Sequence, residues 1–571
     1  MPLKAHIPDE LLSHIFSFLQ PPRPEVLGRA RYEHIEWALP DDLPAVNRYS
    51  ATSEKQYLPQ LKTDDAQHKL GLSTLNSCMR ACVRFENIAR PLLYESYPGQ
   101  PIAGLQAFNR TLFRRSDLAR MVKFITIGCW HMNMLDRLDR WWKSTIRKVG
   151  PGQKLLPALL SKAEAGHEDA QVALLLFLCG NVQAIDLSAP ALFHMSVVKC
   201  LFKDIAQERS DAVLCGEDQG ISPTPTANLS LRILRALNPR TSDTSLSVSV
   251  SAYDVLLQLP TITRLTLHRM SCQQDVVSPP MPQLQELCLW RCDLDADFCN
   301  SLKTCKALRT LEIIWPGMSV DHMQNMCPMS TIIDYKFIGD VICQSFPLLE
   351  KLVLEPREAY FGENCRQLRS LDLSSMTSLQ ELAVEACALW GEHAIDSRLP
   401  QDIEAPLPGL QDVLPPSIRK LSVLVHRRCD RPLSEVEEVE EIKLQRNQML
   451  ILNGALRYLV DAPLSLRSVH LDMPSQEVHE GFDRLDEFFD ELGFTRSVVN
   501  ADPEVQRASP VVGTSTPKDQ RVKLRDTFSM WLPGTDRWPT VVIKRLEDAK
   551  TEADLARWRA VLDEKVEEAR R

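Results

Sequence analysis

The feature that most constrains the fold of this 571-residue chain is a six-residue pattern of apolar side chains that recurs along much of its length. In each copy the first, fourth and sixth positions are apolar and the others vary. The copies begin at Val122, Val182, Ile262, Leu284, Leu308, Leu349, Leu368, Leu379, Ile418 and Leu466. One copy proves nothing in a leucine-rich chain, but this recurrence predicts an internal repeat.

The spacing of the copies predicts an irregular repeat array. The copies at Ile262, Leu284 and Leu308 are 22 and 24 residues apart, whereas the later gaps are 41, 19, 11, 39 and 48 residues. The first two gaps fall within the range of roughly 20–29 residues of leucine-rich repeats. Residues 284–294 and 379–389 resemble the full consensus of that family, with Cys292 and Cys387 where it has Asn or Cys.

Each such repeat supplies one short strand and one returning helix or loop, and no repeat buries its leucines alone. The expected fold class is therefore α/β: an irregular leucine-rich-repeat solenoid with parallel strands on the concave face and helices and loops on the convex face. Several copies follow a proline-containing turn, as in Leu259-Pro260 and Phe346-Pro347. This punctuation fits the loop that leads into each strand.

The residues between the apolar positions are expected to point outward onto the concave sheet, because side chains alternate along a strand. They form the predicted target-binding face: Arg264, His268, Glu286, Trp290, Glu312, Glu355, Asp372 and Glu385. Trp290 has two interpretations, since an outward aromatic is typical of a binding anchor and a flanking insertion could instead cover it. The acidic members indicate a partner with basic character, although surface strands are usually only solvated.

Two amphipathic segments precede the repeats. The first, residues 7–19, opens with Pro8 and two acidic residues, as helix N-termini favour. Its apolar side chains recur at spacings of three and four: Leu11, Leu12, Ile15, Phe16 and Leu19. On this stripe alone the segment is an ordinary core helix. The second segment, residues 72–94, carries Leu75, Cys82, Arg84, Phe85, Ile88 and Ala89.

Together the two segments resemble an F-box, and the whole layout is similar to F-box proteins with leucine-rich repeats, the substrate receptors of SCF-type cullin-RING ubiquitin ligases. The resemblance implies that the F-box binds a Skp-type adaptor, and through it cullin and RING subunits, while the repeats hold a protein target. The adaptor-facing residues would be drawn from Pro8, Leu11, Leu12, Ile15, Leu19, Leu75, Cys82 and Phe85. The sequence leaves open which of these instead pack the F-box core.

The chain departs from the F-box pattern between the two segments. The family has a short connector there, whereas residues 20–71 form a polar insertion with six prolines. A long loop costs only about 0.6 kcal/mol of closure free energy per doubling of length, so the insertion does not prevent the two helices from packing. It does make an exact copy of the family's partner-facing surface doubtful.

These patterns divide the chain into three predicted regions. Residues 1–100 are an F-box-like helical domain with the inserted loop 20–71, and residues 101–480 are the irregular solenoid. Residues 481–571 are a C-terminal extension with a flexible stretch at 500–520 and a charged terminal helix at 544–571. A long helix is expected over residues 433–460. The longest apolar run, 172–179, is expected to be a core segment, because a membrane span needs ~18 apolar residues.

Composition and motifs exclude several classes of function. A net charge of −9 argues against nucleic-acid binding, and the first 20 residues lack the features of a secretory signal, which predicts a cytoplasmic or nuclear protein. The sixteen cysteines are then expected to be buried thiols rather than disulfides, and they show no metal-ligand spacing. No catalytic or phosphate-binding motif is present, so we expect neither a cofactor nor catalysis.

Two alternatives to the ligase receptor remain at this stage. One is a leucine-rich-repeat interaction scaffold that takes no part in ubiquitination. The other is an enzyme whose site is assembled from distant residues.

Overall fold

A computed structural model describes part of the chain, in two compact units, Met1–Cys305 and Lys306–Arg571. The described ranges are 7–20, 70–97, 102–127, 155–164, 168–188, 197–198, 200–203, 231–237, 248–249, 259, 261–268, 270–272, 281–290, 292–294, 302–315, 335–356, 371–390, 410–424, 468–472, 494–499 and 540–545. Nearly all of the insertion 20–71, the helix 433–460 and the stretch 500–520 lie outside these ranges. Among the described residues, no helix is both long and apolar enough to cross a bilayer.

The first unit begins with a small group of helices, which we call the helical module (residues 7–20 and 70–94). It contains α1 (Asp9–Ser17), a helix of residues 70–81 and α4 (Val83–Tyr94). Phe16, Leu75 and Ala89 form its buried core. Other apolar side chains pack against this core while remaining partly exposed: Leu19, Cys78, Met79, Phe85, Ile88, Leu92 and Leu93. The two amphipathic segments thus pack against one another despite the insertion between them.

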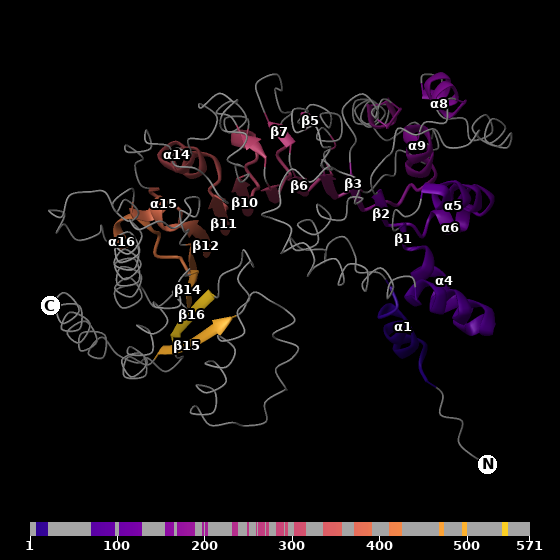
Figure 1. The fold of residues 1–571 in the computed structure, drawn as a ribbon, viewed down its shortest axis with the longest axis horizontal. Coiled ribbons are helices and arrows are strands. Elements are labelled where there is room, and N and C mark those ends of the chain that lie inside the picture. The colour runs from indigo at the N-terminus through magenta and orange to yellow at the C-terminus, as the bar shows by residue number, and fades with distance from the viewer. Residues whose placement is uncertain are drawn as a thin grey trace, which may run out of the picture. The chain divides into compact units, whose positions relative to one another are not determined.

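Parallel strands follow the helical module in the first unit. They are β1 (Ser96–Tyr97), β2 (Phe124–Ile127), β3 (Ala184–Ser188), β4 (Ile233–Leu237), β6 (Arg264–His268) and β8 (Glu286–Trp290), paired in that order (Figure 1). The main helices are α5 (Ile102–Arg114), α6 (Ser116–Ala119), α8 (Leu155–Glu164) and α9 (Glu168–Leu178). Residues 172–179 lie in and just after α9 and are almost entirely buried, which confirms the predicted core segment.

A second, smaller sheet of the first unit pairs β5 (Val248–Ser249), β7 (Met270–Cys272) and β9 (Asp293–Leu294), also in parallel. A short 3-10 helix, η4 (Leu302–Thr304), lies near the end of this unit.

The second unit has the same kind of parallel sheet. Its strands are β10 (Thr310–Trp315), β11 (Lys351–Pro356), β12 (Glu381–Glu385), β13 (Lys420–Leu424) and β14 (Ser468–Asp472). Two antiparallel strands then extend the sheet, with β16 (Thr540–Arg545) next to β14 and β15 (Phe494–Val499) at the edge. Lys544 and Arg545 were predicted to begin a helix. That prediction is wrong, because they continue a run of four β-branched residues that favours a strand.

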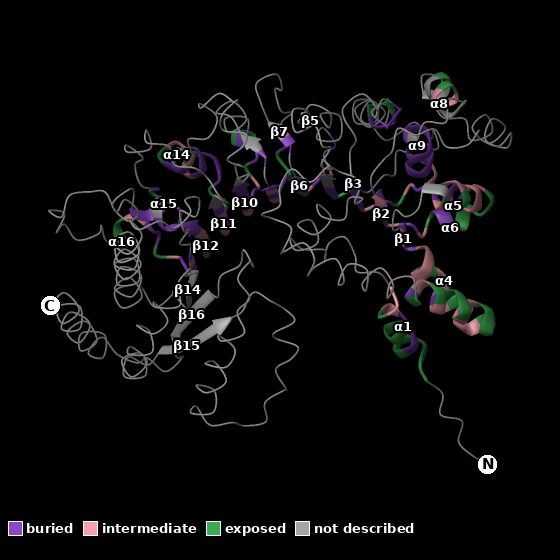
Figure 2. Cartoon of the chain, viewed as in Figure 1, coloured by how far each residue is buried: buried purple, intermediate pink, exposed green. Residues whose placement is uncertain are grey.

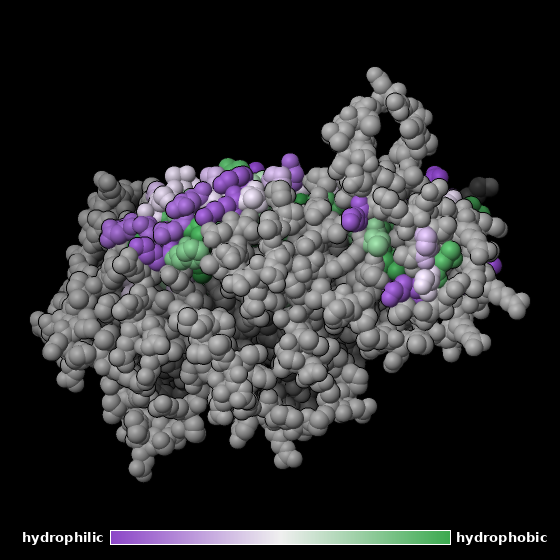
Figure 3. Space-filling model, turned by 90° about the horizontal axis from the view of Figure 1, so that it is seen from above, coloured by the Kyte–Doolittle hydropathy of each residue, from purple (hydrophilic) through white to green (hydrophobic). Residues whose placement is uncertain are grey.

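The helices of the second unit are α14 (Tyr335–Ser345), α15 (Ala386–Trp390) and α16 (Leu410–Val413). α14 buries Val341 and Ile342 and exposes Lys336, Asp340 and Gln344 at a spacing of four. This is the division of faces expected of a helix that covers a sheet. The surface seen from above includes a broad hydrophilic area next to a smaller apolar one (Figure 3).

The strands start through a repeated set of backbone hydrogen bonds, which we call the edge ladder. At the second position of eight copies of the six-residue pattern, the N–H donates to the carbonyl oxygen of the equivalent residue next to the preceding strand. In the first unit these donors are Lys123, Gln183, Arg232, Thr263 and Gln285, and in the second they are Glu350, Gln380 and Arg419, all at 2.8 Å. The ladder fixes the register and therefore sends each set of leucines to the same side.

The apolar positions of the pattern are buried wherever the structure describes their side chains, for example Leu287 and Leu289 in β8 and Leu352 and Leu354 in β11. Each fully buried leucine contributes about 1.5–3 kcal/mol relative to an exposed one. The observed fold class is therefore α/β with parallel strands and accompanying helices, as the pattern predicted.

One copy of the pattern was assigned to a strand wrongly, and another copy was not recognised. β11 pairs directly with β12, so the copy at Leu368 contributes no strand between them. Leu371 and Leu373 are buried, but their N–H groups bond to the carbonyl oxygens of Ala388 and Val413, at 2.7 and 2.8 Å. Conversely, β4 arises from a copy beginning at Leu231, which the sequence analysis missed because Ala236 occupies the sixth position.

Glu95 joins the helical module to the first strands. Its carboxylate accepts hydrogen bonds from the Gln20 side chain at 2.9 Å and from the Lys123 ammonium group at 2.9 Å. Its carbonyl oxygen also starts the edge ladder by accepting from the N–H groups of Lys123 and Phe124. Gln20 follows α1 and donates a second bond to the carbonyl oxygen of Leu92 in α4. The buried carboxylate of Glu95 therefore links Gln20, which follows α1, to Lys123, which precedes β2.

Candidate interaction surfaces

The helical module separates its predicted adaptor-facing residues into core and surface. Leu12 and Leu75 are buried, so as direct partner contacts they are corrected to core residues. Leu19 and Phe85 pack against the core, and the Phe85 ring meets the Phe16 ring edge-on at a centroid distance of 5.5 Å. Core packing thus takes up Leu12 and Leu75, whereas Leu19 and Phe85 pack against the core and remain partly exposed, so their role in adaptor binding stays a prediction.

A second apolar stripe on α1 faces solvent. Leu11, Ile15 and Phe18 follow one another at spacings of four and three, which places them on one face of the helix, and Ile7 lies just before its first turn. They are 44–76% exposed, and the exposed face of α1 is visible in Figure 2. We call these four residues the apolar row. Leu11 and Ile15 were predicted surface residues, whereas Ile7 and Phe18 were missed, although the same spacing rule identifies them.

The start of α4 lies at the N-terminal end of the apolar row. The Arg84 side chain bonds to the Asp9 carboxylate at 2.6 Å and also donates to the carbonyl oxygen of Ile7. Beside it, Val83 is largely exposed and Cys82 caps α4, its sulfur accepting from the N–H of Phe85 at 3.4 Å. Pro8 and Cys82 are also exposed, as expected of adaptor-facing residues. The Arg84 contacts hold the beginnings of the two helices together.

The first-unit residues that were predicted to form a concave binding face are less open than expected. Trp290 is only 8% exposed, so the interpretation as an open binding anchor is wrong. Arg264 and Glu286 are half-exposed, but they form an ion pair with one another at 2.9 Å. His268 lies at the end of β6 in register with Trp290, and its side chain is outside the described part of the structure.

An apolar cluster occupies the third position of the pattern in β2, β3 and β4. It consists of Phe124, Ala184 and Ile233, all buried. Side chains at this position were predicted to be outward and accessible. Three consecutive apolar residues at equivalent positions were the available signal, and it was missed because the copy at Leu231, which supplies Ile233, was not recognised.

Most of the acidic residues that were predicted to bind a target in the second unit form ion pairs or hydrogen bonds within the chain. Glu312 pairs with Lys351 at 2.6 Å, and buried Glu385 accepts a hydrogen bond from the Tyr335 hydroxyl at 3.1 Å. Asp372 lies outside the sheet, where its carboxylate accepts from the N–H and hydroxyl of Ser374. Glu355 lies in β11, and its side chain is not described. These residues therefore do not form the continuous acidic face that the sequence suggested.

In the described part of the chain, no three His, Cys, Asp or Glu side chains are grouped as metal ligands. Comparison of the sequence with protein-family models and with curated proteins found no match in either case. The apolar row and the edges of the two sheets are thus the features from which a function must be argued.

Proposed function

We propose that this chain is the substrate-recognition subunit of an SCF-type ubiquitin ligase, an F-box protein with an irregular leucine-rich-repeat solenoid. In this proposal the helical module binds a Skp-type adaptor and the repeats bind a target protein. The observation that carries the proposal is the apolar row. Four large apolar side chains are exposed, three along α1 and Ile7 just before it, while other side chains of α1 pack in the module core, and exposed apolar patches of this kind mark interaction sites.

The apolar row can supply part of the binding free energy of a complex. Full burial of a leucine, isoleucine or phenylalanine contributes about 1.5–3 kcal/mol, so completing the burial of four half-exposed side chains contributes roughly 4 kcal/mol. Association costs at least about 4 kcal/mol of lost translational and rotational freedom. The row alone therefore only offsets that cost, so it can anchor a complex only together with neighbouring contacts near Pro8, Cys82 and Val83, which must supply the net affinity.

The chain would act by positioning. A target held on the repeats is kept near the catalytic subunits, which raises its effective concentration at the site of ubiquitin transfer. The chemistry of transfer belongs to the other subunits, and this chain contributes binding energy and geometry.

The test is recovery of a purified recombinant Skp-type adaptor by the full chain and by the double variant Leu11→Asp, Ile15→Asp. Both residues are exposed in the free chain, so the substitutions spare the module core. Two charges buried against an apolar partner should weaken binding at least 100-fold. Leu348→Asp is the matched control, because Leu348 is a similarly exposed leucine (48%) in the second unit.

Equal recovery of the adaptor by the wild-type chain and the double variant would refute the proposed docking surface. If the wild-type chain recovers no adaptor at all, the ligase proposal itself fails. The chain would then be better described as a repeat scaffold outside ubiquitination.

A further inference from the structure

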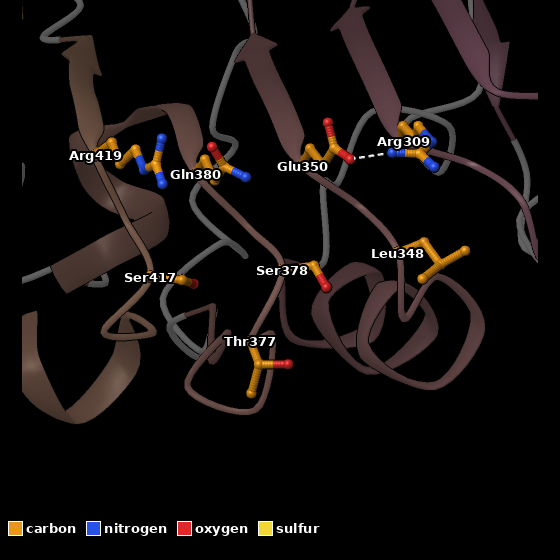
Figure 4. A pocket seen from close by; sticks show the side chains of 8 residues that line it. All are labelled: Arg309, Leu348, Glu350, Thr377, Ser378, Gln380, Ser417 and Arg419. Carbon is orange, nitrogen blue, oxygen red and sulfur yellow. Dashed lines mark hydrogen bonds and ion pairs between the residues drawn. The ribbon is translucent and has the colours of Figure 1, made fainter. Parts of the chain in front are cut away.

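A pocket of about 340 Å³, open to solvent, lies along the edge ladder of the second unit. Figure 4 shows Arg309, Glu350, Gln380 and Arg419 in one row across four neighbouring strands. Leu348 and Ser378, from the turns that precede β11 and β12, lie on the other side of the pocket. The ladder hydrogen bonds fix the backbone under this row, so its side chains start from defined positions about 4.8 Å apart.

The two arginines of the pocket differ in whether a described carboxylate pairs with them. Arg309 forms an ion pair with Glu350 (Figure 4), whereas no described carboxylate pairs with the exposed side chain of Arg419. The lining therefore carries one net positive charge, located toward β13. The Gln380 amide, from the strand next to that of Arg419, and the Ser378 hydroxyl, near the middle of the pocket in Figure 4, provide further hydrogen-bond donors. An arginine guanidinium accompanied by such donors suits a carboxylate or phosphate oxygen.

The other end of the pocket is apolar. Leu348 is 48% exposed and is one of the few large apolar side chains of the described second unit that faces solvent. It lies in the turn before β11, beneath Arg309 in Figure 4, and β11 is two strands, or about 10 Å, from the strand of Arg419. An extended peptide covers that distance in about three residues. A short peptide can therefore reach both the guanidinium and the leucine.

We propose that this pocket binds an extended segment of a target protein, with an anionic side chain against Arg419 and an apolar side chain against Leu348. The inference rests on the proposed function, since it assigns a class of target segment to the repeats. It is opposite in charge to the basic partner that the acidic concave residues suggested. Glu286 and Glu312 are paired, Glu385 is buried and Asp372 lies off the sheet, whereas Arg419 is exposed.

The test uses fluorescein-labelled pentapeptides and the full chain without any adaptor. One peptide carries glutamate and leucine separated by two serines, with a terminal glycine. In its counterparts, phosphoserine or glutamine replaces the glutamate. Fluorescence anisotropy should show at least tenfold tighter binding of the glutamate or phosphoserine peptide than of the glutamine peptide, and this preference should weaken with added salt.

Variants locate the binding site. Arg419→Gln should remove the preference for the anionic peptides. The matched control is Arg232→Gln, because Arg232 is an exposed arginine at the same edge-ladder position in the first unit, and this variant should keep the preference. Glu350→Gln releases Arg309 and should tighten binding of the anionic peptides several-fold. Leu348→Ser should weaken the binding of all three peptides by a similar factor.

Preference for the phosphoserine peptide assigns a phosphorylated target, and preference for the glutamate peptide assigns an acidic one. Either result supports the pocket. Equal binding of all three peptides, or an equal loss of preference in Arg419→Gln and Arg232→Gln, would overturn it. Adaptor recovery is measured separately and should be unchanged in Arg419→Gln, so failure of the pocket is distinguishable from failure of the proposed function.

Discussion

The substitution Leu75→Ala is expected to open the helical module while leaving the repeats folded. Leu75 is fully buried and packs with Phe16 and Ala89 at the centre of the module core. Truncating a buried leucine to alanine costs roughly 2–5 kcal/mol, from lost apolar burial and from the cavity left behind. A cost of about 3 kcal/mol in local opening corresponds to an increase of roughly 100-fold in amide exchange, at 1.4 kcal/mol per factor of ten.

Hydrogen exchange followed by mass spectrometry measures this effect, because it reports α1, α4 and α9 separately. The control is Leu11→Ala, which truncates a leucine that is half-exposed on the same module. A surface substitution of this kind changes stability by at most about 0.5 kcal/mol, so exchange in α1 and α4 should rise by roughly twofold at most. Unchanged exchange in Leu75→Ala, or equal acceleration in both variants, would refute the division into core and surface.

Two further predictions concern close packing and thiol reactivity. Gly71→Ala should destabilise the module by about 1–3 kcal/mol, because the added Cβ would collide with the backbone carbonyl oxygen of Leu19, and native exchange rates in this variant would contradict that contact. Burial raises the pKa of the Cys179 thiol, so brief treatment of the native protein with iodoacetamide should modify exposed Cys82 and spare Cys179, as mass spectrometry of the digest can show. Rapid labelling of Cys179 without denaturant would contradict its burial.

The buried side of the strands could be predicted from the sequence, because it depends on local periodicity. The spacing of Leu284, Leu287 and Leu289 correctly places two leucines on the buried side of β8 and the third just before it. The same rule failed at Leu371 and Leu373, which are equally buried but bond to the carbonyl groups of residues near α15 and α16. Periodicity reports that a residue is buried, and it does not report which layer buries it.

The exposed side chains were harder to predict from the sequence, because exposure depends on segments that are far apart in the chain. Glu385 reads as a solvated acid until the Tyr335 hydroxyl, 50 residues earlier, is placed beside it. Likewise, Arg419 and Leu348 are unremarkable in the sequence, and only the pairing of β11, β12 and β13 brings them to one pocket. On α1, the spacing of apolar residues indicated a single stripe, and only packing with residues 70–94 shows that Leu12 and Phe16 are buried while Leu11 and Ile15 remain exposed.

The buried carboxylate of Glu95 has a mechanical consequence. Because it bonds to Gln20 after α1 and to Lys123 before β2, rotating the module away from the first strands would break at least one of these bonds. Leaving a buried polar group without such partners costs about 1–3 kcal/mol, and more for a charged one. The module and β2 are therefore expected to move together.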